Sequence, residues 1–377
     1  MRLALLASNY YRIDRSIAKG TEAFVYEFAR ALDKRIKETG ADIDITAFAS
    51  ADSDLPFPIV SNHPVATTLD PLVKDQKTVE RALVTEAFSR AQDFDIYCVH
   101  ISNGESVLPL IGEMKKPVLI SLHGGVEMAY DSSLFAPLKE LKHVHFVSIS
   151  DAQRRRLPDL PYMQTIHHGI DEKVFQFNPI GGERMVWAGR GVAEKGLGVV
   201  LDVVTTTKHS LGIAVALKDQ WKAWYETSVE PRIETLGHRV TVSKNLDRAV
   251  LPAFYCNAKL FLFPVGWEEP FGLVTIESMA VGTPVVAYAR GSLSEIIEDG
   301  KTGFLVNPSE SDIRGDFIVK KTGVEGLKEA VERIYAMSVE EYKAMRRVCR
   351  THVEEKFTLE KMVDSYIALY KKLVIPR

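Results

Sequence analysis

Two glutamates stand close together beside an apolar part of the chain. Glu269 and Glu277 belong to WEEPFGLVTIESMAVGTPVVAYARG and have seven residues between them. The preceding KLFLFPV predicts a buried strand and LVTIESMAVG a helix that begins near Leu273, so Glu269 lies in the loop between them and Glu277 about one turn into the helix. Ionised carboxylates are pure acceptors that suit two vicinal hydroxyls. The pair therefore predicts a ligand that carries hydroxyl groups.

A second loop combines glycines with two cations. In WAGRGVAEKGLGVV a strand ends at Ala188 and a helix begins near Leu197, with Arg190 and Lys195 in the loop between them. Loop amides and a helix N-terminus form an anion site, and a guanidinium beside an ammonium suits a diphosphate. Glu194 stands where a dinucleotide fingerprint needs its third glycine, and the Walker pattern is also missing. The alternative is that both cations are solvated loop charges.

The two loops together outline one ligand. Gly272 allows the backbone to approach a ligand closely and leaves the following amides free to face a phosphate. Hydroxyls at the two glutamates, with a diphosphate between them, give the shape of a nucleotide sugar. The alternatives left open are a surface charge at Glu269 and a partner of the helix dipole at Glu277.

Composition indicates an ordinary globular protein. The 377 residues suit two domains, and 46% apolar and 26% charged residues are usual values. A net charge of −3 argues against wholesale nucleic-acid binding. Cys98, Cys256 and Cys349 are too far apart in sequence to predict a disulfide framework or a zinc knuckle. The first apolar run is too short for a signal peptide or a membrane span, so we expect a cytoplasmic protein.

The order of elements predicts the α/β class. Short apolar runs alternate with amphipathic segments, as in parallel sheets covered on both faces. We expect two Rossmann-like, doubly wound domains at 1–174 and 175–357, followed by a helix at 358–377. Thr21 is the expected N-cap of the first helix, in TEAFVYEFARALDKRI. Since ligands bind beyond the carboxyl ends of such strands, two facing domains are expected to form a cleft there.

The motifs resemble those of retaining glycosyltransferases of family four, and they follow one another along the chain in the family's order. The spacing in EPFGLVTIE and the following GTPVVAYARGSLSEIIEDGKTGFLV resemble the family's signature, and GRGVAEKG resembles its Gly-Arg…Glu-Lys-Gly element. KGTEAFVYEFARAL, FVSISDAQRRRL and IHHGIDEKVF resemble further segments, so the likeness covers most of the chain. It implies the GT-B fold and transfer of a sugar from a nucleotide donor with retention of configuration.

The resemblance also implies roles for individual side chains. Arg190 and Lys195 are expected to bind the diphosphate, Glu269 the hydroxyls of the donor sugar, and Glu277 the ribose. His123, at a strand end in SLHGG, is expected to lie near the reacting sugar.

Other implied contacts come from the backbone. Amides near Phe271, Gly272 and Leu273 are expected to meet the sugar and the phosphate, and Gly20 is expected to let the N-terminal loop close over the phosphates. The last helix is expected to return to the N-terminal domain.

Three positions depart from the family's pattern. His168 stands where Asn usually precedes the Gly of GID, and Lys19 replaces the first glycine of a usual pair. Ala216-Leu217 replaces an Ala-Gly pair, with Lys218 next, which leaves recognition of the base or ribose open.

We therefore expect a retaining glycosyltransferase that moves a hexose-type sugar from a nucleotide-diphosphate sugar to the hydroxyl of a glycan, glycolipid or small molecule. No cofactor or metal is expected, because the two cations and the loop amides supply the charge that a leaving phosphate needs. The alternatives are a non-hydrolysing nucleotide-sugar epimerase and a non-catalytic, two-lobed sugar-binding protein.

The basic tract Arg154–Arg156 suggests a further partner. It lies beside apolar residues in DAQRRRLPDLPYM, so peripheral contact with an anionic membrane is one interpretation. A solvated loop is the favoured one.

Overall fold

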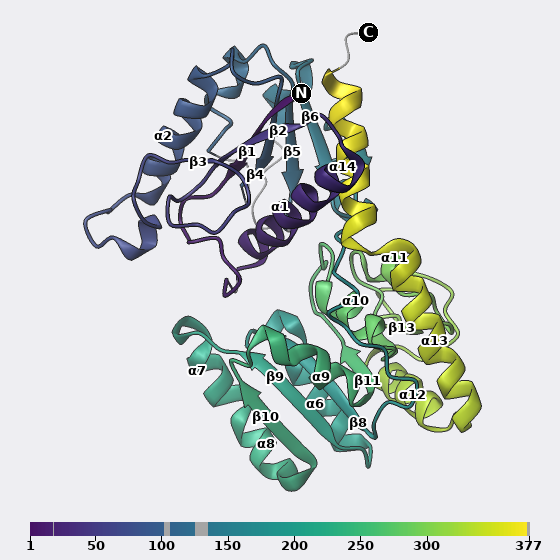
Figure 1. Cartoon of the computed structure of the whole chain (residues 1–377). Coiled ribbons are helices and arrows are strands. Elements are labelled where there is room, and N and C mark those ends of the chain that lie inside the picture. Colours follow the sequence, from purple (N-terminus) through teal and green to yellow (C-terminus); the bar gives the residue numbers. More distant parts are fainter. Residues whose placement is uncertain (18, 102–105, 125–134, 375–377) are drawn as a thin grey trace. The chain divides into compact units, whose positions relative to one another are not determined.

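The chain divides into two units, each built on a parallel sheet covered by helices (Figure 1). Unit 1 holds Met1–Gly169 and Leu359–Arg377, and unit 2 holds Ile170–Thr358. This is a computed structural model, and it describes residues 1–17, 19–101, 106–124 and 135–374. The predicted α/β class, with two doubly wound parallel sheets, is confirmed.

Unit 1 has a seven-stranded sheet in the order β3-β2-β1-β4-β5-β6-β7. The strands are β1 (Arg2–Ala7), β2 (Asp44–Phe48), β3 (Ile59–Val60), β4 (Ile96–His100), β5 (Val118–Leu122), β6 (Val144–Ser148) and β7 (Tyr162–Thr165). The helices are α1 (Gly20–Thr39), α2 (Gln76–Ser89), α5 (Asp151–Arg154) and α14 (Leu359–Val374). The sequence analysis did not identify β3 and β7, which are short outer strands without a long apolar run.

The start of α1 differs from the prediction. The helix begins at Gly20, and its N-cap is Lys19, whose extended backbone (φ −95°, ψ 133°) turns the chain into the helix. The amide of Ala23 donates to the carbonyl of Lys19 (2.8 Å), which closes the first turn before Thr21 could act as a cap. The prediction of Thr21 as N-cap is therefore wrong. The apolar face of α1 is buried as predicted.

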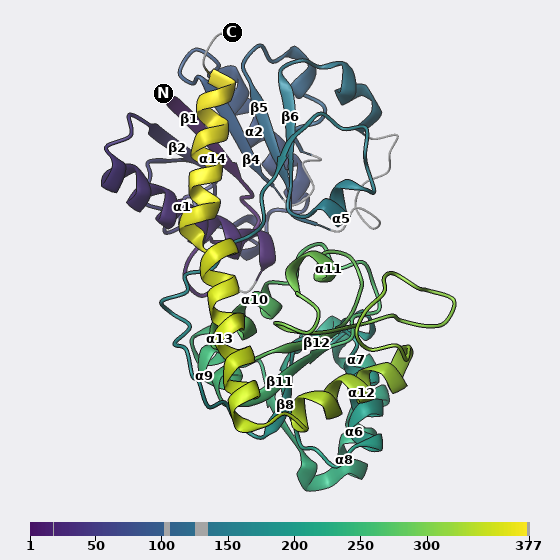
Figure 2. The ribbon, with the colours of Figure 1, turned by 90° about the vertical axis from the view of Figure 1, so that its right-hand side faces the viewer.

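The last helix, α14, lies along α1 (Figures 1 and 2). Both helices bury apolar side chains in one core of unit 1. Arg35 of α1 also donates to both carboxylate oxygens of Asp364, at 2.7 and 2.8 Å. The first boundary between units lies earlier than the expected residue 174, because the amide of Ile170 donates to the carbonyl of Phe357 in unit 2 (2.9 Å).

Unit 2 has a six-stranded sheet in the order β10-β9-β8-β11-β12-β13. The strands are β8 (Arg184–Arg190), β9 (Leu211–Ala216), β10 (Val240–Lys244), β11 (Ala258–Phe263), β12 (Val285–Tyr288) and β13 (Gly303–Val306). The helices are α6 (Leu197–Thr206), α7 (Asp219–Ser228), α8 (Glu230–Leu236), α9 (Leu251–Cys256), α10 (Leu273–Ala280), α11 (Leu293–Ile296), α12 (Gly323–Tyr335) and α13 (Val339–Lys356). The order reverses between β8 and β11, so the carboxyl ends of these two neighbouring strands form the topological switch point, where ligands of open α/β sheets bind.

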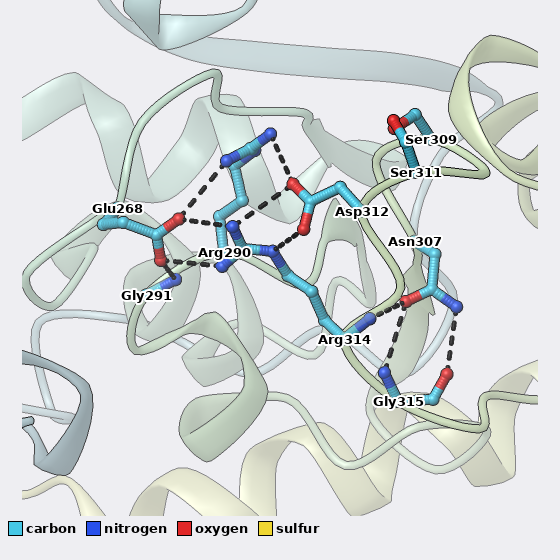
Figure 3. Close-up of polar contacts among 9 residues, drawn as sticks. All are labelled: Glu268, Arg290, Gly291, Asn307, Ser309, Ser311, Asp312, Arg314 and Gly315. Atoms are coloured by element: carbon cyan, nitrogen blue, oxygen red, sulfur yellow. Dashed lines mark hydrogen bonds and ion pairs between the residues drawn. The ribbon is translucent and has the colours of Figure 1, made fainter.

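A ring of four charged side chains fixes the loop that follows β11 (Figure 3). Arg314 donates to Glu268 Oε2 at 2.9 Å and to Asp312 at 2.8 Å, and it forms an ion pair with Glu268 Oε1 at 2.8 Å. Arg290 bridges the same two carboxylates, at 3.2 Å from Glu268 and 2.8 Å from Asp312. The amide of Gly291 also donates to Glu268, at 2.7 Å. The loop after β11 is thus tied to segments that follow β12 and β13.

Hydrogen bonding keeps the Glu268 carboxyl ionised. Burial opposes ionisation, but hydrogen bonds from Arg314 and from the Gly291 amide, together with both guanidinium charges, lower the pKa of Glu268 below its usual 4.5. A carboxyl group whose pKa is lower in the folded state stabilises the fold above its unfolded pKa. This contribution is lost as the pH falls through the lower, folded value.

We therefore expect Glu268→Gln to lower the free energy of unfolding by about 1–3 kcal/mol at pH 7, since a charge-assisted hydrogen bond is lost. The difference from the wild type should shrink as the pH falls below the usual 4.5 and through the lower, folded pKa of Glu268. Urea unfolding followed by tryptophan fluorescence reports on unit 2, because all four tryptophans lie there. Glu310→Gln removes the same charge from an exposed position of the neighbouring loop and should have little effect. A penalty for Glu268→Gln that is independent of pH would contradict this account.

Candidate functional site

The loops after β8 and β11 touch each other at the switch point. The amide of Gly266 donates to the carbonyl of Glu194 (2.8 Å), and Gly196 has a left-handed backbone (φ +78°). A Cβ atom at Gly196 would lie 2.1 Å from the carbonyl oxygen of Pro264, so a glycine is required at this position. The close approach brings together the two loops that the sequence analysis singled out.

Lys195 and Glu269 form an ion pair between these loops. Lys195 Nζ is 2.5 Å from Glu269 Oε2, and the two side chains are 12% and 8% exposed. Charges attract strongly in such a poorly solvated place, and loss of either partner leaves the other charge uncompensated. The structure thus brings together the cation predicted for the diphosphate and the carboxylate predicted for the sugar.

Two tryptophans surround this pair. The Lys195 ammonium lies 4.9 Å from the centroid of the Trp267 ring, and the indole N–H of Trp267 donates to Glu269 Oε2 at 2.9 Å. The indole N–H of Trp187 donates to the Lys195 carbonyl at 3.0 Å. The sequence analysis did not identify either tryptophan as part of the site, although Trp267 lies two residues before Glu269.

The backbone around Glu269 is held by the segment after β12. A Cβ atom at Gly291 (φ +60°) would lie 2.2 Å from the carbonyl oxygen of Glu269. Ser292 donates to that oxygen from its amide (2.9 Å) and its hydroxyl (3.1 Å), and the hydroxyl also donates to the Phe271 carbonyl (2.7 Å). The loop is therefore fixed whether or not the carboxylate of Glu269 has a ligand.

Gly272 is the N-cap of α10 and has a left-handed backbone (φ +82°). It has no side chain to cap the helix, and the Thr275 amide donates to the Gly272 carbonyl (2.9 Å), so the amides of Leu273 and Val274 are the ones that a ligand could meet. Phe271 is buried, at 2% exposure, and fixes where the helix begins. A helix start of this kind attracts an anion, as predicted for a phosphate.

Glu277 lies in α10 and is buried. The Tyr255 hydroxyl is 3.5 Å from its Oε2, and the Arg248 guanidinium is 3.9 Å from its Oε1. Burial, followed by the charge of Glu277, raises the pKa of Tyr255 well above its usual range, so the phenol stays protonated. No sequence pattern indicated Tyr255 or Arg248 as neighbours of Glu277, because they come from α9 and the short turn before it.

Arg190 is the last residue of β8 and is exposed. Its guanidinium lies 5.6 Å from the centroid of the Trp221 ring, and Lys218 Nζ lies 5.8 Å from the same ring. The side chain therefore packs towards α7, whereas Lys195 turns towards Glu269. The predicted strand end at Ala188 is therefore two residues early: Arg190 ends β8, Lys195 lies in the following loop, and only Lys195 belongs to the buried pair.

His123 lies in unit 1, in a row of three histidines. Its Nε2 is 3.0 Å from Nδ1 of His100, and its Nδ1 is 3.3 Å from Nε2 of His168. Phe24 packs on the row, with ring centroids 4.4 Å apart at His123. Burial and then His168 lower the pKa of His100 to about 3, and burial and then His100 lower that of His123 well below 6.5. The His123 ring is thus neutral at pH 7, and both its nitrogens contact other imidazoles.

Gly20, also in unit 1, begins α1. A Cβ atom there would meet nothing within 4 Å, so packing within the described residues does not require a glycine. In the basic tract, the Arg154 guanidinium lies 5.0 Å from the centroid of the Tyr162 ring.

The parts of the chain that the structure describes include neither a membrane-spanning helix nor a metal cluster. None of the described helices combines the length and the apolar character needed to cross a membrane. Among the same residues, no group of three or more His, Cys, Asp or Glu side chains is arranged so that it could hold a metal ion.

The chain is similar to known glycosyltransferases in sequence and in fold. The profile of the family "Glycosyl transferases group 1" matches residues 171–314, which include both loops of the site. The chain is 28% identical over 187 residues to an uncharacterized 41.2 kDa protein in the cps region of Klebsiella pneumoniae, a match that spans 50% of this chain and 46% of that protein. It is 22% identical over 365 residues to the phosphatidyl-myo-inositol mannosyltransferase of Mycobacterium leprae, spanning 91% of this chain and 93% of the relative.

A solved structure shares the whole fold. HepE of Anabaena, in complex with UDP and glucose, superposes with a TM-score of 0.72 at 16% identity, over 99% of this chain and 100% of HepE. The chain thus has the GT-B fold, and in its loops and sequence it is similar to the group 1 glycosyltransferases, of the family-four type.

Proposed function

We propose that the protein is a retaining, metal-independent glycosyltransferase that moves a hexose-type sugar from a nucleoside-diphosphate sugar to an acceptor hydroxyl. The observation that carries the proposal is the buried pair of Lys195 and Glu269 at the switch point of unit 2. A cation and a carboxylate side by side suit a ligand in which a phosphate adjoins a hydroxyl-bearing ring. UDP in the related fold of HepE supports a nucleotide donor.

The proposed chemistry is a substitution at the sugar's anomeric carbon. The bond from this carbon to the diphosphate oxygen breaks, the bond to the acceptor oxygen forms, and the acceptor proton passes to the departing phosphate. Arg190, Lys195 and the first amides of α10 stabilise the negative charge that develops on the phosphate. These groups take the part that a divalent cation plays in other transferases.

Retention follows if the acceptor attacks from the face that the phosphate leaves. Lys195 and Trp267 both bind Glu269 Oε2, which suits this side chain to binding hydroxyls rather than attacking the sugar. The one-bond NMR coupling between the product's anomeric carbon and its proton tests this directly, because it differs between the two anomers.

Two other functions remain alternatives. A non-hydrolysing epimerase would convert the donor without any acceptor, so incubation with the donor alone distinguishes it. A non-catalytic sugar-binding protein would turn over no donor at all.

The two glutamates are expected to affect different steps. Glu269→Ala should lower kcat sharply, while the bare nucleoside diphosphate still binds, because the transferred sugar loses its acceptor. Glu277→Ala should weaken binding of the nucleoside diphosphate by about 1–3 kcal/mol, as for a lost charge-assisted hydrogen bond. Calorimetry with the nucleoside diphosphate and steady-state kinetics with the donor measure these effects.

Glu298→Ala is a control, since this glutamate pairs with Lys356 in the same unit, away from the two loops. Loss of nucleotide binding in Glu269→Ala but not in Glu277→Ala would mean that the roles are exchanged. Unchanged binding and rate in both variants would remove the main support for the proposal.

Activity is expected to persist in EDTA, since protein cations and amides supply the charge at the leaving group. Initial rates with and without EDTA measure this. Complete loss of turnover that magnesium or manganese restores would contradict the assignment of this role to Arg190 and Lys195.

Gly20→Ala separates a role towards a ligand from a role in folding. The melting temperature should stay the same or rise, because alanine favours the helix and the added Cβ has open space. Turnover should fall if the backbone at Gly20 must approach the donor. Gly196→Ala is the contrasting variant and should lower the melting temperature, since its Cβ would collide with Pro264. Full activity in Gly20→Ala would remove Gly20 from the site.

A further inference from the structure

Trp267 touches both members of the buried ion pair with different parts of its ring. The face of the indole lies under the Lys195 ammonium, at 4.9 Å, and its edge donates a hydrogen bond to Glu269 Oε2, at 2.9 Å. A cation over an aromatic face and an N–H directed at a carboxylate are both favourable contacts. A single half-buried side chain therefore contacts the cation and the anion together.

Both contacts to the Glu269 carboxylate fall on the same oxygen. Lys195 Nζ and Trp267 Nε1 each donate to Oε2. Within the described residues, Oε1 takes part in no hydrogen bond that competes with a ligand. The carboxylate is thus oriented with one oxygen anchored and the other available.

The two contacts respond differently to a diphosphate. If Lys195 binds the phosphates, as the proposed function states, its ammonium leaves Oε2 and Glu269 loses its counter-charge. The indole N–H is expected to stay in place, because Ser292, Gly291 and the ring at Glu268 fix the Trp267–Glu269 loop. Its hydrogen bond then becomes the contact that keeps the carboxylate oriented.

We propose that Trp267 is a positioning residue for the transferred sugar: its indole N–H holds Glu269 Oε2 after Lys195 has turned to the diphosphate, so that Oε1 accepts the sugar hydroxyls. This inference rests on the proposed function. The sugar is therefore oriented by Glu269 and Trp267 as a unit, and the nucleotide is bound by other groups.

The test removes the indole N–H and keeps an aromatic face. A thermal-shift screen of UDP-, ADP- and GDP-sugars first identifies the donor that the wild type binds and transfers. For that donor, Trp267→Phe should lower kcat about tenfold, whereas the Kd of the matching nucleoside diphosphate changes less than twofold. Trp224→Phe is the matched control, since this half-buried tryptophan lies in α7 and should leave both quantities unchanged.

A second comparison separates positioning from a general loss of structure. The ratio of the Kd values for the nucleoside diphosphate and for the intact donor measures what the sugar adds to binding. Trp267→Phe should change this ratio when Glu269 is present. The same substitution should leave the ratio unchanged in the Glu269→Ala background, because the indole acts through that carboxylate. A merely structural effect would weaken nucleotide binding in both backgrounds.

The outcomes separate the two claims. Wild-type kcat in Trp267→Phe, or equal effects on nucleotide and donor binding, overturns the role of Trp267 and leaves the proposed function standing. Absence of binding and transfer with every donor in the screen, already in the wild type, overturns the proposed function itself.

Discussion

The contact on which the site depends is a lysine and a glutamate that neutralise each other in a poorly solvated place. Lys195 and Glu269 come from different loops, and either charge would be costly to bury alone. Their pairing requires the close approach at Gly196, where the Pro264 carbonyl leaves no room for a side chain. A ligand that separates the pair must therefore supply both an anion and hydroxyl groups. This requirement restricts the candidate ligands more strongly than either residue does alone.

Glu268 and Glu269 are neighbours in the loop after β11, but they have different partners. Glu268 is bound by Arg290 and Arg314, and its pKa is lowered, so its charge fixes the loop. Glu269 is bound by Lys195, the cation that the proposed function assigns to the diphosphate. In unit 1, the three histidines His100, His123 and His168 are neutral, because burial lowers the pKa of each. The charged groups in the loops after β8 and β11 thus form ion pairs, whereas the His123 ring is neutral and contacts two other imidazoles.

The sequence predicted the parts of the fold that depend on local pattern. Continuous apolar runs such as KLFLFPV correspond to buried strands, and the helix starts near Leu197 and Leu273 were placed correctly. The pairing of Lys195 with Glu269 was not predicted, because it depends on β8 lying beside β11, and hydrophobic periodicity does not specify strand order. The contact of Trp267 with Lys195 and the ring at Glu268 were missed for the same reason, since these partners come from distant segments. Thr21 was a reasonable cap by composition, but the backbone at Lys19 starts the helix earlier.

The most direct test is a crystal structure of the protein with an intact nucleoside-diphosphate sugar bound. The account predicts that Lys195 Nζ has left Glu269 and contacts a phosphate oxygen, that Glu269 Oε1 accepts from a sugar hydroxyl, and that the indole N–H of Trp267 remains on Oε2. An unbroken pair of Lys195 and Glu269, with the nucleotide sugar bound elsewhere on the chain, would contradict it.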